Sequence, residues 1–328
     1  MARIFAYIVH KAGVPDDSAF ELAAAARKID PAAAPTAILT GSGADLDAAC
    51  KTLAASYPEI WKIANEALAY PNAELVRKAL VKVLPSSSIV LVPHEHFGID
   101  LAPGLSIKTN SAFVSDVLDI AGVEGAGLKV VRQEFGGQVS AHVRCDISSG
   151  AVVTIRPGAF KPLEGAPVSG AVVDKSNDIG TLAAGRRYLE TVVAEAGDVD
   201  ITKYNILVSI GRGIQEKDNV AIAQELADAL GAAVSCSRPV VDAKWMDKSR
   251  QVGSSGKTVK PKVYLACGIS GSFQHLAGIK GSPFLIAINK NPKAPIFQVA
   301  DVGIVDDILE FLPELTNKVR EMRSVAAK

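Results

Sequence analysis

The stretch from Tyr264 to Asn289, YLACGISGSFQHLAGIKGSPFLIAIN, holds the residue types best suited to bind a charged ligand. Its apolar run to Cys267 is followed by Gly268-Ile269-Ser270-Gly271, a turn of small residues. The backbone N–H groups of such a turn and the N-terminus of a following helix suit a phosphate, because they are donors without partners in the chain. His275 lies one turn into the predicted helix, so its imidazole can reach the same ligand, although a histidine packed in the core is the alternative.

Three further turns of small or polar residues follow predicted strands in the second half of the chain. They are Gly211-Arg212-Gly213, Ser237-Arg238-Pro239 and the segment 252–256. Turns at the carboxyl ends of strands in one open sheet converge on one crevice, so we expect a single ligand site. The residue types alone leave two roles open for each arginine, a phosphate or cofactor contact and a surface ion pair. Ser254-Ser255-Gly256 is equally compatible with a solvated loop.

The other motifs do not indicate a nucleotide-binding loop or a metal site. Gly41-Ser42-Gly43 lacks the GxGxxG spacing and the P-loop lysine, so we interpret it as a plain strand-to-helix turn. Pro93-His94-Glu95-His96 has two histidines that would share one side of a strand, but no clear third ligand, so we expect a loop and no metal. The cysteines form no CxxC pair, which argues against zinc or iron–sulfur sites; they are Cys50, Cys145, Cys236 and Cys267.

Composition predicts a two-domain α/β protein. The chain has 328 residues, of which 48% are hydrophobic and only 5% aromatic, so the core must consist of small aliphatic side chains, as in parallel sheets. Lys+Arg and Asp+Glu number 35 each, which argues against nucleic acid as the main partner. The N-terminus MARIFAYIVHKAG resembles no presequence, and no apolar run reaches the ~20 residues of a membrane span. We therefore expect a cytoplasmic protein without a membrane span.

The first domain is expected to alternate strands and helices and then change pattern. Apolar runs and cap residues predict strands at 3–9, 35–39, 60–64 and 88–92, and helices at 18–29, 45–55 and 73–83. Four further strand-like pieces, at 114–120, 128–135, 139–145 and 152–155, are interpreted as a meander that finishes the sheet. Residues 160–180 are interpreted as a connector, and 181–196 as a helix.

The second domain is predicted to be a Rossmann-like unit. Strands are expected at 206–210, 232–235, 263–267, 284–288 and 294–299, and helices at 219–230, 272–279 and 306–319, the last interrupted by Pro313. The fold class is thus α/β, with two domains that each contain a mostly parallel sheet flanked by helices. We place the domains at 1–197 and 198–328.

Taken together, these segments resemble the alpha subunit of electron transfer flavoproteins. The run GISGSFQHLAGI, then AINK, then APIFQVAD is close to the signature of that family. The resemblance is specific across about residues 205–315. It is looser over residues 1–200, where RPGAF at 156–160 and FGIDLAP at 97–103 still fit.

The resemblance implies FAD bound by the second domain, with a beta subunit, carrying AMP or a second FAD, packed on the first domain and completing the crevice. It places Arg238 over the isoalloxazine ring, Ser255 at flavin N5 and His275 near the C2 carbonyl, where all three would tune the flavin. Ser270 and Gly271 would bind the pyrophosphate through their N–H groups. The implied FAD contacts are Arg212, Ser237, Arg238, Val252, Gly253, Ser254, Ser255, Ser270, Gly271, Ser272, Phe273, Gln274, His275, Asn289 and Asp307.

Two departures from the family pattern stand near the implied flavin. Ser254-Ser255 occupies the place where the family usually has Gln-Thr. Serine keeps the hydroxyl near N5 but is less restrained at χ1 than threonine. Val302 stands where tyrosine is common.

The leading functional hypothesis is a one-electron shuttle. FAD would take electrons from dehydrogenases, such as the acyl-CoA dehydrogenases of fatty acid beta-oxidation, and deliver them singly to a quinone oxidoreductase. A variant is a bifurcating complex that oxidises NADH. A nicotinamide-dependent dehydrogenase is disfavoured because no GxGxxG with a downstream acidic residue follows a strand. A nucleotide-binding module without redox chemistry is the third class, which the first domain alone suggests.

Overall fold

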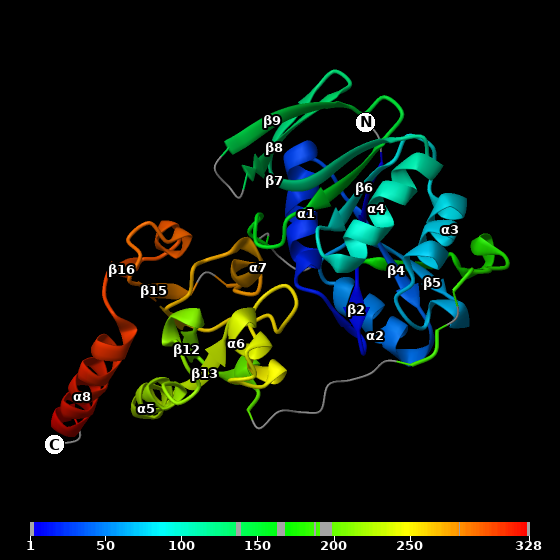
Figure 1. Cartoon of the computed structure of the whole chain (residues 1–328). Coiled ribbons are helices and arrows are strands. Elements are labelled where there is room, and N and C mark those ends of the chain that lie inside the picture. Colours follow the sequence, from blue (N-terminus) through cyan, green and yellow to red (C-terminus); the bar gives the residue numbers. More distant parts are fainter. Residues whose placement is uncertain are drawn as a thin grey trace. The chain divides into compact units, whose positions relative to one another are not determined.

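The computed structural model describes residues 3–135, 139–162, 168–186, 188–190, 199–281 and 283–326. The chain divides into two compact units, Met1–Glu190 and Thr191–Lys328, each with its own sheet (Figure 1). The boundary expected at residue 198 stays a prediction, because residues 191–198 lie outside the described part of the chain.

The first unit contains a nine-stranded sheet in the order β11-β5-β4-β1-β6-β10-β7-β8-β9. Neighbours from β11 to β7 are parallel, whereas β7, β8 and β9 pair antiparallel. The strands are β1 (Ile4–Tyr7), β4 (Thr36–Gly41), β5 (Glu59–Ala64), β6 (Ile89–Pro93), β7 (Ala112–Glu124), β8 (Gly127–Glu134), β9 (Val139–Asp146), β10 (Ala151–Ile155) and β11 (Ala171–Asp174). A separate small ribbon consists of β2 (His10–Lys11) and β3 (Val14–Pro15).

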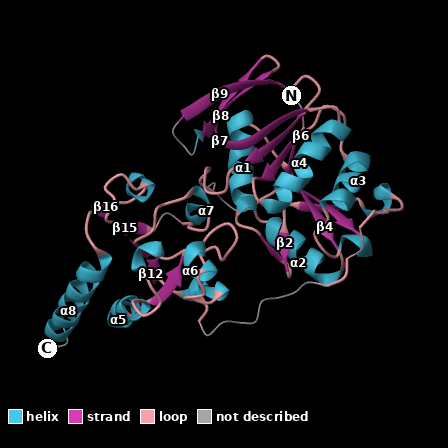
Figure 2. Cartoon of the chain, viewed as in Figure 1, coloured by secondary structure: helices cyan, strands magenta, loops and turns pink. Residues whose placement is uncertain are grey.

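Helices cover both faces of this sheet (Figure 2). They are α1 (Ser18–Ile29), α2 (Gly43–Leu53), α3 (Ala73–Val83) and α4 (His96–Lys108). Successive residues of a strand point to opposite faces, so Ala6 packs in the core with α1 and α2 while Phe5 packs in the core with α3 and α4. Both cores are rich in alanine, valine, isoleucine and leucine, as the low aromatic content predicts.

Two predictions for the first unit were wrong. The His94–His96 segment is not simply a loop, because His96 begins α4. The helix α4 itself was not predicted, and it contains Pro103. Its Gly98 allows contact with the end of β6, since a Cβ there would lie 1.9 Å from the Pro93 carbonyl oxygen. The strand β10 does not end the meander: it inserts, buried along its length, between β6 and β7.

The segment between β10 and the second unit also differs from its prediction. The expected connector contains β11, which pairs with β5 and is the edge strand of the sheet. Within the expected helix at 181–196, residues 181–186 and 188–190 are not helical, and the rest lies outside the described residues.

The second unit is built on a fully parallel five-stranded sheet in the order β13-β12-β14-β15-β16. The strands are β12 (Ile206–Ile210), β13 (Ala233–Cys236), β14 (Val263–Cys267), β15 (Phe284–Ile288) and β16 (Val302–Ile304), and the helices are α5 (Val220–Leu230), α6 (Arg238–Asp242), α7 (Phe273–Leu276) and α8 (Ile308–Ala326). The chain runs outward from β12 to β13 and then returns to β14 on the other side, so the strand order reverses between β12 and β14. This confirms the predicted α/β fold class.

The two faces of the second sheet are covered differently. Leu226 of α5 and Leu312 of α8 belong to the core on one face. The core on the other face includes Val252, Val259 and Ile296, which come from connecting segments. The segments that form the candidate site are therefore part of the hydrophobic core of this unit.

Three element predictions for the second unit need correction. Residues 294–299 form a short 3-10 helix, Pro295–Gln298, and the edge strand is β16. Pro313 lies inside α8 and does not interrupt it. The buried side chains of Leu312 and Thr316, on either side of the proline, anchor the helix. The helix after the 268–271 turn has only four residues, Phe273–Leu276, instead of eight. No helix in the described ranges is long and apolar enough to cross a membrane.

Candidate functional site

The turns after β12 and β14 touch each other where the strand order reverses. The Gly211 N–H donates to the Cys267 carbonyl at 2.9 Å, and the Gly213 N–H donates to the Gly268 carbonyl at 3.1 Å. A Cβ on Gly213 would lie 2.7 Å from the Gly268 Cα, so a side chain at this position would push the turns apart. Open α/β sheets bind ligands at this point, and glycine keeps the backbones accessible there.

The turn after β14 presents a row of backbone donors. Among the described residues, the N–H groups of Ser270, Gly271 and Ser272 donate to no backbone carbonyl. Gly271 has φ +84°, and a Cβ on it would lie 2.3 Å from the Ile296 nitrogen. The Ser270 carbonyl accepts from that Ile296 N–H at 3.0 Å, which fixes the turn. Consecutive free N–H groups form a concave anion site, and they matter more than the dipole of a four-residue helix.

His275 is buried behind this turn, with 4% of its surface exposed. Its Nε2 lies 2.8 Å from the Tyr264 hydroxyl, which donates to Ser209 Oγ at 2.7 Å. Its Nδ1 is also buried and has no hydrogen-bond partner in the described part of the chain. Burial lowers the pKa of His275 to about 4, against a smaller opposing effect of the Val252 backbone. The imidazole is therefore neutral near pH 7 and retains one unused nitrogen.

The segment 252–256 is tied to the same edge by two backbone hydrogen bonds. The Val252 N–H donates to the Cys236 carbonyl at the end of β13, at 2.9 Å, and the Ser254 N–H donates to the Gln274 carbonyl of α7 at 2.7 Å. Gly253 has φ +138°, and a Cβ there would lie 2.8 Å from the same Gln274 carbonyl oxygen. The predicted convergence of this segment with the 268–271 turn is therefore present.

Ser255 is oriented by a residue that the sequence analysis did not single out. Gln251 is 3% exposed, and its side-chain Nε2 donates to Ser255 Oγ at 2.9 Å. Because the serine oxygen accepts this bond, its own proton stays available for another acceptor. A glutamine amide is thus present beside this serine, three positions before Ser254, where the family pattern has Gln.

The two arginines lie at the ends of neighbouring strands. Arg212 follows β12 and is exposed. Ser237, 7% exposed, follows β13, and its N–H donates to the Ile210 carbonyl at 3.0 Å. Arg238 begins α6, with 69% of its side chain exposed and Nε 3.3 Å from Asp242 Oδ2. Both roles considered for Arg238, surface ion pair and cofactor contact, stay compatible with this geometry.

Asn289 and Asp307 make hydrogen bonds and an ion pair within the chain at this edge of the sheet. Asn289 Nδ2 donates to the Ile269 carbonyl at 2.9 Å and so braces the turn after β14. Asp307 accepts from the Leu309 N–H at 3.0 Å and pairs with Lys290 Nζ at 2.6 Å. The Lys290 contact is the main reason that the pKa of Asp307 is lowered. Their predicted contacts with FAD would add to these internal roles.

The structure thus brings all predicted site residues to the carboxyl edge of one sheet. Phe273 and Gln274 are exposed on α7, with Phe273 at 52%, beside Ser272 and above the buried His275. The site residues that the sequence analysis missed are Tyr264, Ser209 and Gln251. Tyr264 offered a usable signal, because a tyrosine inside a buried strand needs a hydrogen-bond partner for its hydroxyl.

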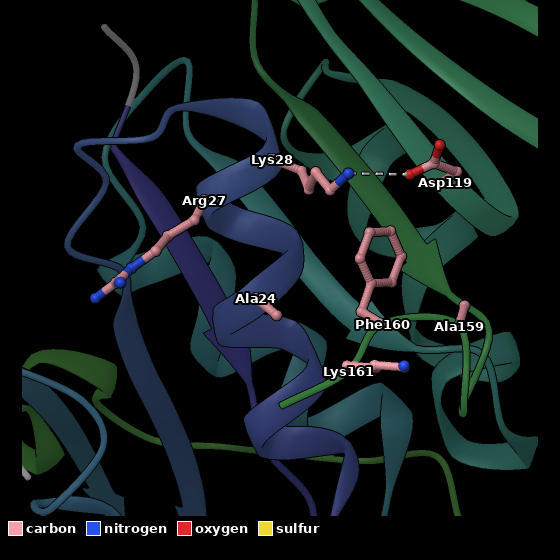
Figure 3. Close-up of a pocket in the computed structure, with 7 residues that line it drawn as sticks. All are labelled: Ala24, Arg27, Lys28, Asp119, Ala159, Phe160 and Lys161. Carbon is pink, nitrogen blue, oxygen red and sulfur yellow. Dashed lines mark ion pairs between the residues drawn. The ribbon is translucent and has the colours of Figure 1, made fainter. Parts of the chain in front are cut away.

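The first unit contains a cavity that is a weaker candidate for a functional site than the sheet edge of the second unit. It measures about 330 Å³ and is lined by Ala24, Arg27, Lys28, Asp119, Ala159, Phe160 and Lys161. Lys28 Nζ already lies 3.8 Å from Asp119 Oδ1, and Figure 3 shows Arg27 pointing away from the other side chains. In the described ranges, no three His, Cys, Asp or Glu side chains are grouped to hold a metal. His94, the nearest metal candidate in the sequence, instead has Nδ1 2.9 Å from Thr154 Oγ1.

Comparisons with known proteins match a family domain to each of the two units. Residues 200–280 match the electron transfer flavoprotein FAD-binding domain, and residues 4–179 match the electron transfer flavoprotein domain. The chain is 45% identical to the electron transfer flavoprotein subunit alpha of Methylophilus methylotrophus, over 70% of both chains. It is 38% identical to protein FixB of Clostridium saccharobutylicum, over 72% of this chain and 71% of that protein. Subunit LctC of the lactate dehydrogenase (NAD(+),ferredoxin) of Acetobacterium woodii is 33% identical, over 76% of this chain and 59% of that protein.

Proposed function

The chain belongs to the electron transfer flavoprotein alpha subunit family and binds FAD, and we propose that it is a carrier that passes electrons one at a time between a dehydrogenase and a quinone oxidoreductase. The family resemblance and the FAD cofactor predicted from the sequence are both confirmed. A beta subunit is the expected partner of an alpha subunit. We propose that it packs on the first unit and completes the site.

The observation that carries the proposal is the combination of an anion site and an unused buried nitrogen at one sheet edge. Ser270, Gly271 and Ser272 offer N–H groups that suit the FAD pyrophosphate. A few residues further along, Nδ1 of His275 is buried without a partner in the described chain. Six buried side-chain nitrogen and oxygen atoms have no partner in the described residues, and this nitrogen is the one that follows the anion turn, three residues after Ser272.

The side chains around the edge would bind and tune the flavin without transforming a substrate. FAD itself supplies the chemistry, because its ring accepts and releases electrons singly. Arg238 carries a fixed positive charge on an exposed side chain, which would favour the reduced, anionic ring and raise its potential. Ser255 has a proton free to donate, since its oxygen accepts from Gln251. His275 stays neutral near pH 7 and acts through the dipole of its ring.

A bifurcating complex is the second candidate, because the LctC relative is a subunit of a lactate dehydrogenase named for both NAD(+) and ferredoxin. That protein is longer, since this chain spans 59% of its length. A bifurcating complex would carry a second FAD in the beta subunit and accept electrons from NADH. The number of flavins per heterodimer and reduction by NADH therefore separate the two candidates.

The test is to co-express the full chain with the beta subunit of the same organism and to record its visible spectrum. We expect a yellow heterodimer that releases FAD on denaturation and is reduced in two separate one-electron steps. Reduction by an acyl-CoA dehydrogenase with its substrate would support the shuttle. A colourless heterodimer would refute FAD binding, and a flavin that is reduced in a single two-electron step would refute the carrier role.

A further inference from the structure

We propose that Gln251 is a positioning residue that selects the rotamer of Ser255 and so orients the serine hydroxyl toward the ring of FAD. The inference rests on the proposed function, in which Ser255 lies at flavin N5. Gln251 is not among the predicted FAD contacts, and it is 3% exposed, whereas Ser255 is exposed. The glutamine therefore acts on the ligand only through the serine.

The backbone holds Gln251 at the end of β13. Gln251 forms a parallel bridge with Cys236, and the next N–H, that of Val252, donates to the Cys236 carbonyl at 2.9 Å. The Gln251 N–H donates to the Lys248 carbonyl at 3.1 Å. The position of Gln251 is thus set by the sheet and by the segment before it.

The loop 252–256 folds back over Gln251. The Lys257 N–H donates to the Gln251 carbonyl at 2.7 Å, which closes the loop at its base. Gly256 allows this close approach, because a Cβ there would lie 2.4 Å from the Gln251 carbonyl oxygen and 3.0 Å from the Gln251 Cγ. Ser255 is consequently held within reach of the glutamine side chain.

The side chain of Gln251 bonds to Ser255 across this loop. Its Nε2 lies 2.9 Å from Ser255 Oγ. An unbonded serine hydroxyl samples three staggered χ1 wells, because serine lacks the γ-methyl group that restrains threonine. A hydrogen bond of ordinary strength favours one well about fivefold over each of the others. Gln251 therefore gives this serine the restraint at χ1 that a threonine would have in its own side chain.

The restraint matters for a hydrogen bond to the flavin, because that bond forms only when the hydroxyl faces N5. A fixed rotamer keeps the hydroxyl in place before the ring gains an electron, so little has to be reorganised at that moment. Gln251 would thus influence the flavin potential without contacting the flavin.

The test uses the complex of the full chain with its beta subunit, loaded with FAD that is labelled with nitrogen-15 at N5. The chemical shift of N5 reports the hydrogen bond at that atom. Ser255→Ala should change this shift most, since the hydroxyl is lost. Gln251→Leu removes the amide and keeps a buried side chain of similar size. It should produce roughly half of the change seen in Ser255→Ala, because the share of the favoured rotamer falls about twofold.

The effect of Gln251→Leu should depend on Ser255. In the Ser255→Ala background it should cause no further change, because it acts through the hydroxyl. In the Ser255→Thr background it should cause a smaller change than with serine, because the γ-methyl group restrains χ1. No change with serine in place, or an equal change in either background, would overturn the positioning role.

The matched control is Gln224→Leu, which removes another amide of the second unit, one that donates to Asp228 Oδ1 at 2.8 Å on the surface of α5. It should leave the N5 signal unchanged. Gln251→Asn keeps an amide but is shorter by one methylene group, so the bond to Ser255 is lost. It should act like Gln251→Leu, and it decides the matter if that variant folds poorly. An N5 signal unchanged in Gln251→Asn would assign the effect to packing and overturn the inference.

Crystal structures of the same complexes give a readout that does not need the flavin. We expect one rotamer of Ser255 in the unmodified chain and more than one in Gln251→Leu. The same single rotamer in both would overturn the inference. Absence of flavin from every complex would instead overturn the proposed function, and the rotamers of Ser255 would still decide the role of Gln251.

Discussion

The two sheets differ in the polar groups at the carboxyl ends of their strands. In the first unit, the polar side chains there are bonded to each other: the Arg156 guanidinium donates to both Asp116 carboxylate oxygens at 2.6 and 2.8 Å. His94 meets Thr154 at 2.9 Å, and Tyr7 meets Thr40 at 2.8 Å. In the second unit, a run of backbone N–H groups and one imidazole nitrogen have no partner in the described chain.

This difference shows that a doubly wound sheet does not by itself make a binding site. Strand ends converge in both units, but side-chain pairs line this edge in the first unit, although His10 Nδ1 is buried there without a partner in the described residues. In the second unit, consecutive backbone donors line it. A polar group bonded internally would have to give up that bond to take a ligand. We therefore expect the location of FAD to depend on the glycine turns and their consecutive backbone donors as well as on topology.

The largest expected effect comes from adding a side chain at Gly271, in the turn after β14 of the second unit. Gly271→Ala should abolish FAD binding and destabilise that unit by about 2–5 kcal/mol, because φ is positive and the new Cβ meets the Ile296 backbone. Flavin content and thermal unfolding of the purified complex measure both effects. Gly185→Ala is the control, since no atom lies within 4 Å of a Cβ there. Full flavin occupancy in Gly271→Ala would contradict the assignment of the turn.

Loss of the ion pair between Arg156 and Asp116 should destabilise the first unit without changing flavin binding. Arg156→Met leaves the Asp116 carboxylate, 17% exposed, without its ion-pair partner and should lower the free energy of unfolding by about 2–4 kcal/mol. Denaturant unfolding measures this change. The exposed pair of Lys318 and Glu321 provides the control, where Lys318→Met should change little. If Arg156→Met loses FAD while the first unit stays fully stable, the contrast between the two edges is wrong.

The buried histidine of the second unit should make its stability depend on pH. The pKa of His275 is about 4 in the folded chain and ~6.5 when unfolded, so between these values only the unfolded chain binds the proton. The free energy of unfolding should therefore fall as pH decreases from about 6.5 to about 4, by up to about 1.4 kcal/mol per pH unit. His275→Gln should remove this contribution. The measurement is urea unfolding at several pH values, and equal slopes for both proteins would show that His275 is not buried as a neutral group.

The smallest effect on stability is expected at Arg238. Its side chain is 69% exposed and its ion pair with Asp242 lies at the surface, so Arg238→Ala should scarcely change unfolding. It should nevertheless lower the FAD midpoint potential, because a cation beside the ring favours the reduced form. A spectroelectrochemical titration measures this shift, with Asp242→Ala as the control for the lost ion pair. A potential equal to that of the unmodified complex would remove Arg238 from the tuning residues.

The sequence revealed strands more reliably than the helices and turns between them. Runs such as 206–210, 263–267 and 284–288 match β12, β14 and β15, because buried parallel strands are continuous apolar segments. The helix α4 escaped prediction because its glycines and Pro103 are favourable only through contacts with the rest of the fold. The 294–299 segment has an apolar run but forms a 3-10 helix, in which Ile296 supports the Ser270 turn.

The amino-acid sequence by itself determined the α/β class, the four turns that carry the site and the family to which the chain belongs. Those features depend on local residue types and their spacing, which are visible along the chain. Only the tertiary structure decided which polar atoms are satisfied. Ser209 lies 55 residues before Tyr264, and Gln251 reaches Ser255 through a particular loop conformation. Hydrogen bonds depend on distances of a few ångströms between separate strands, and that geometry is set by the packing of the whole sheet.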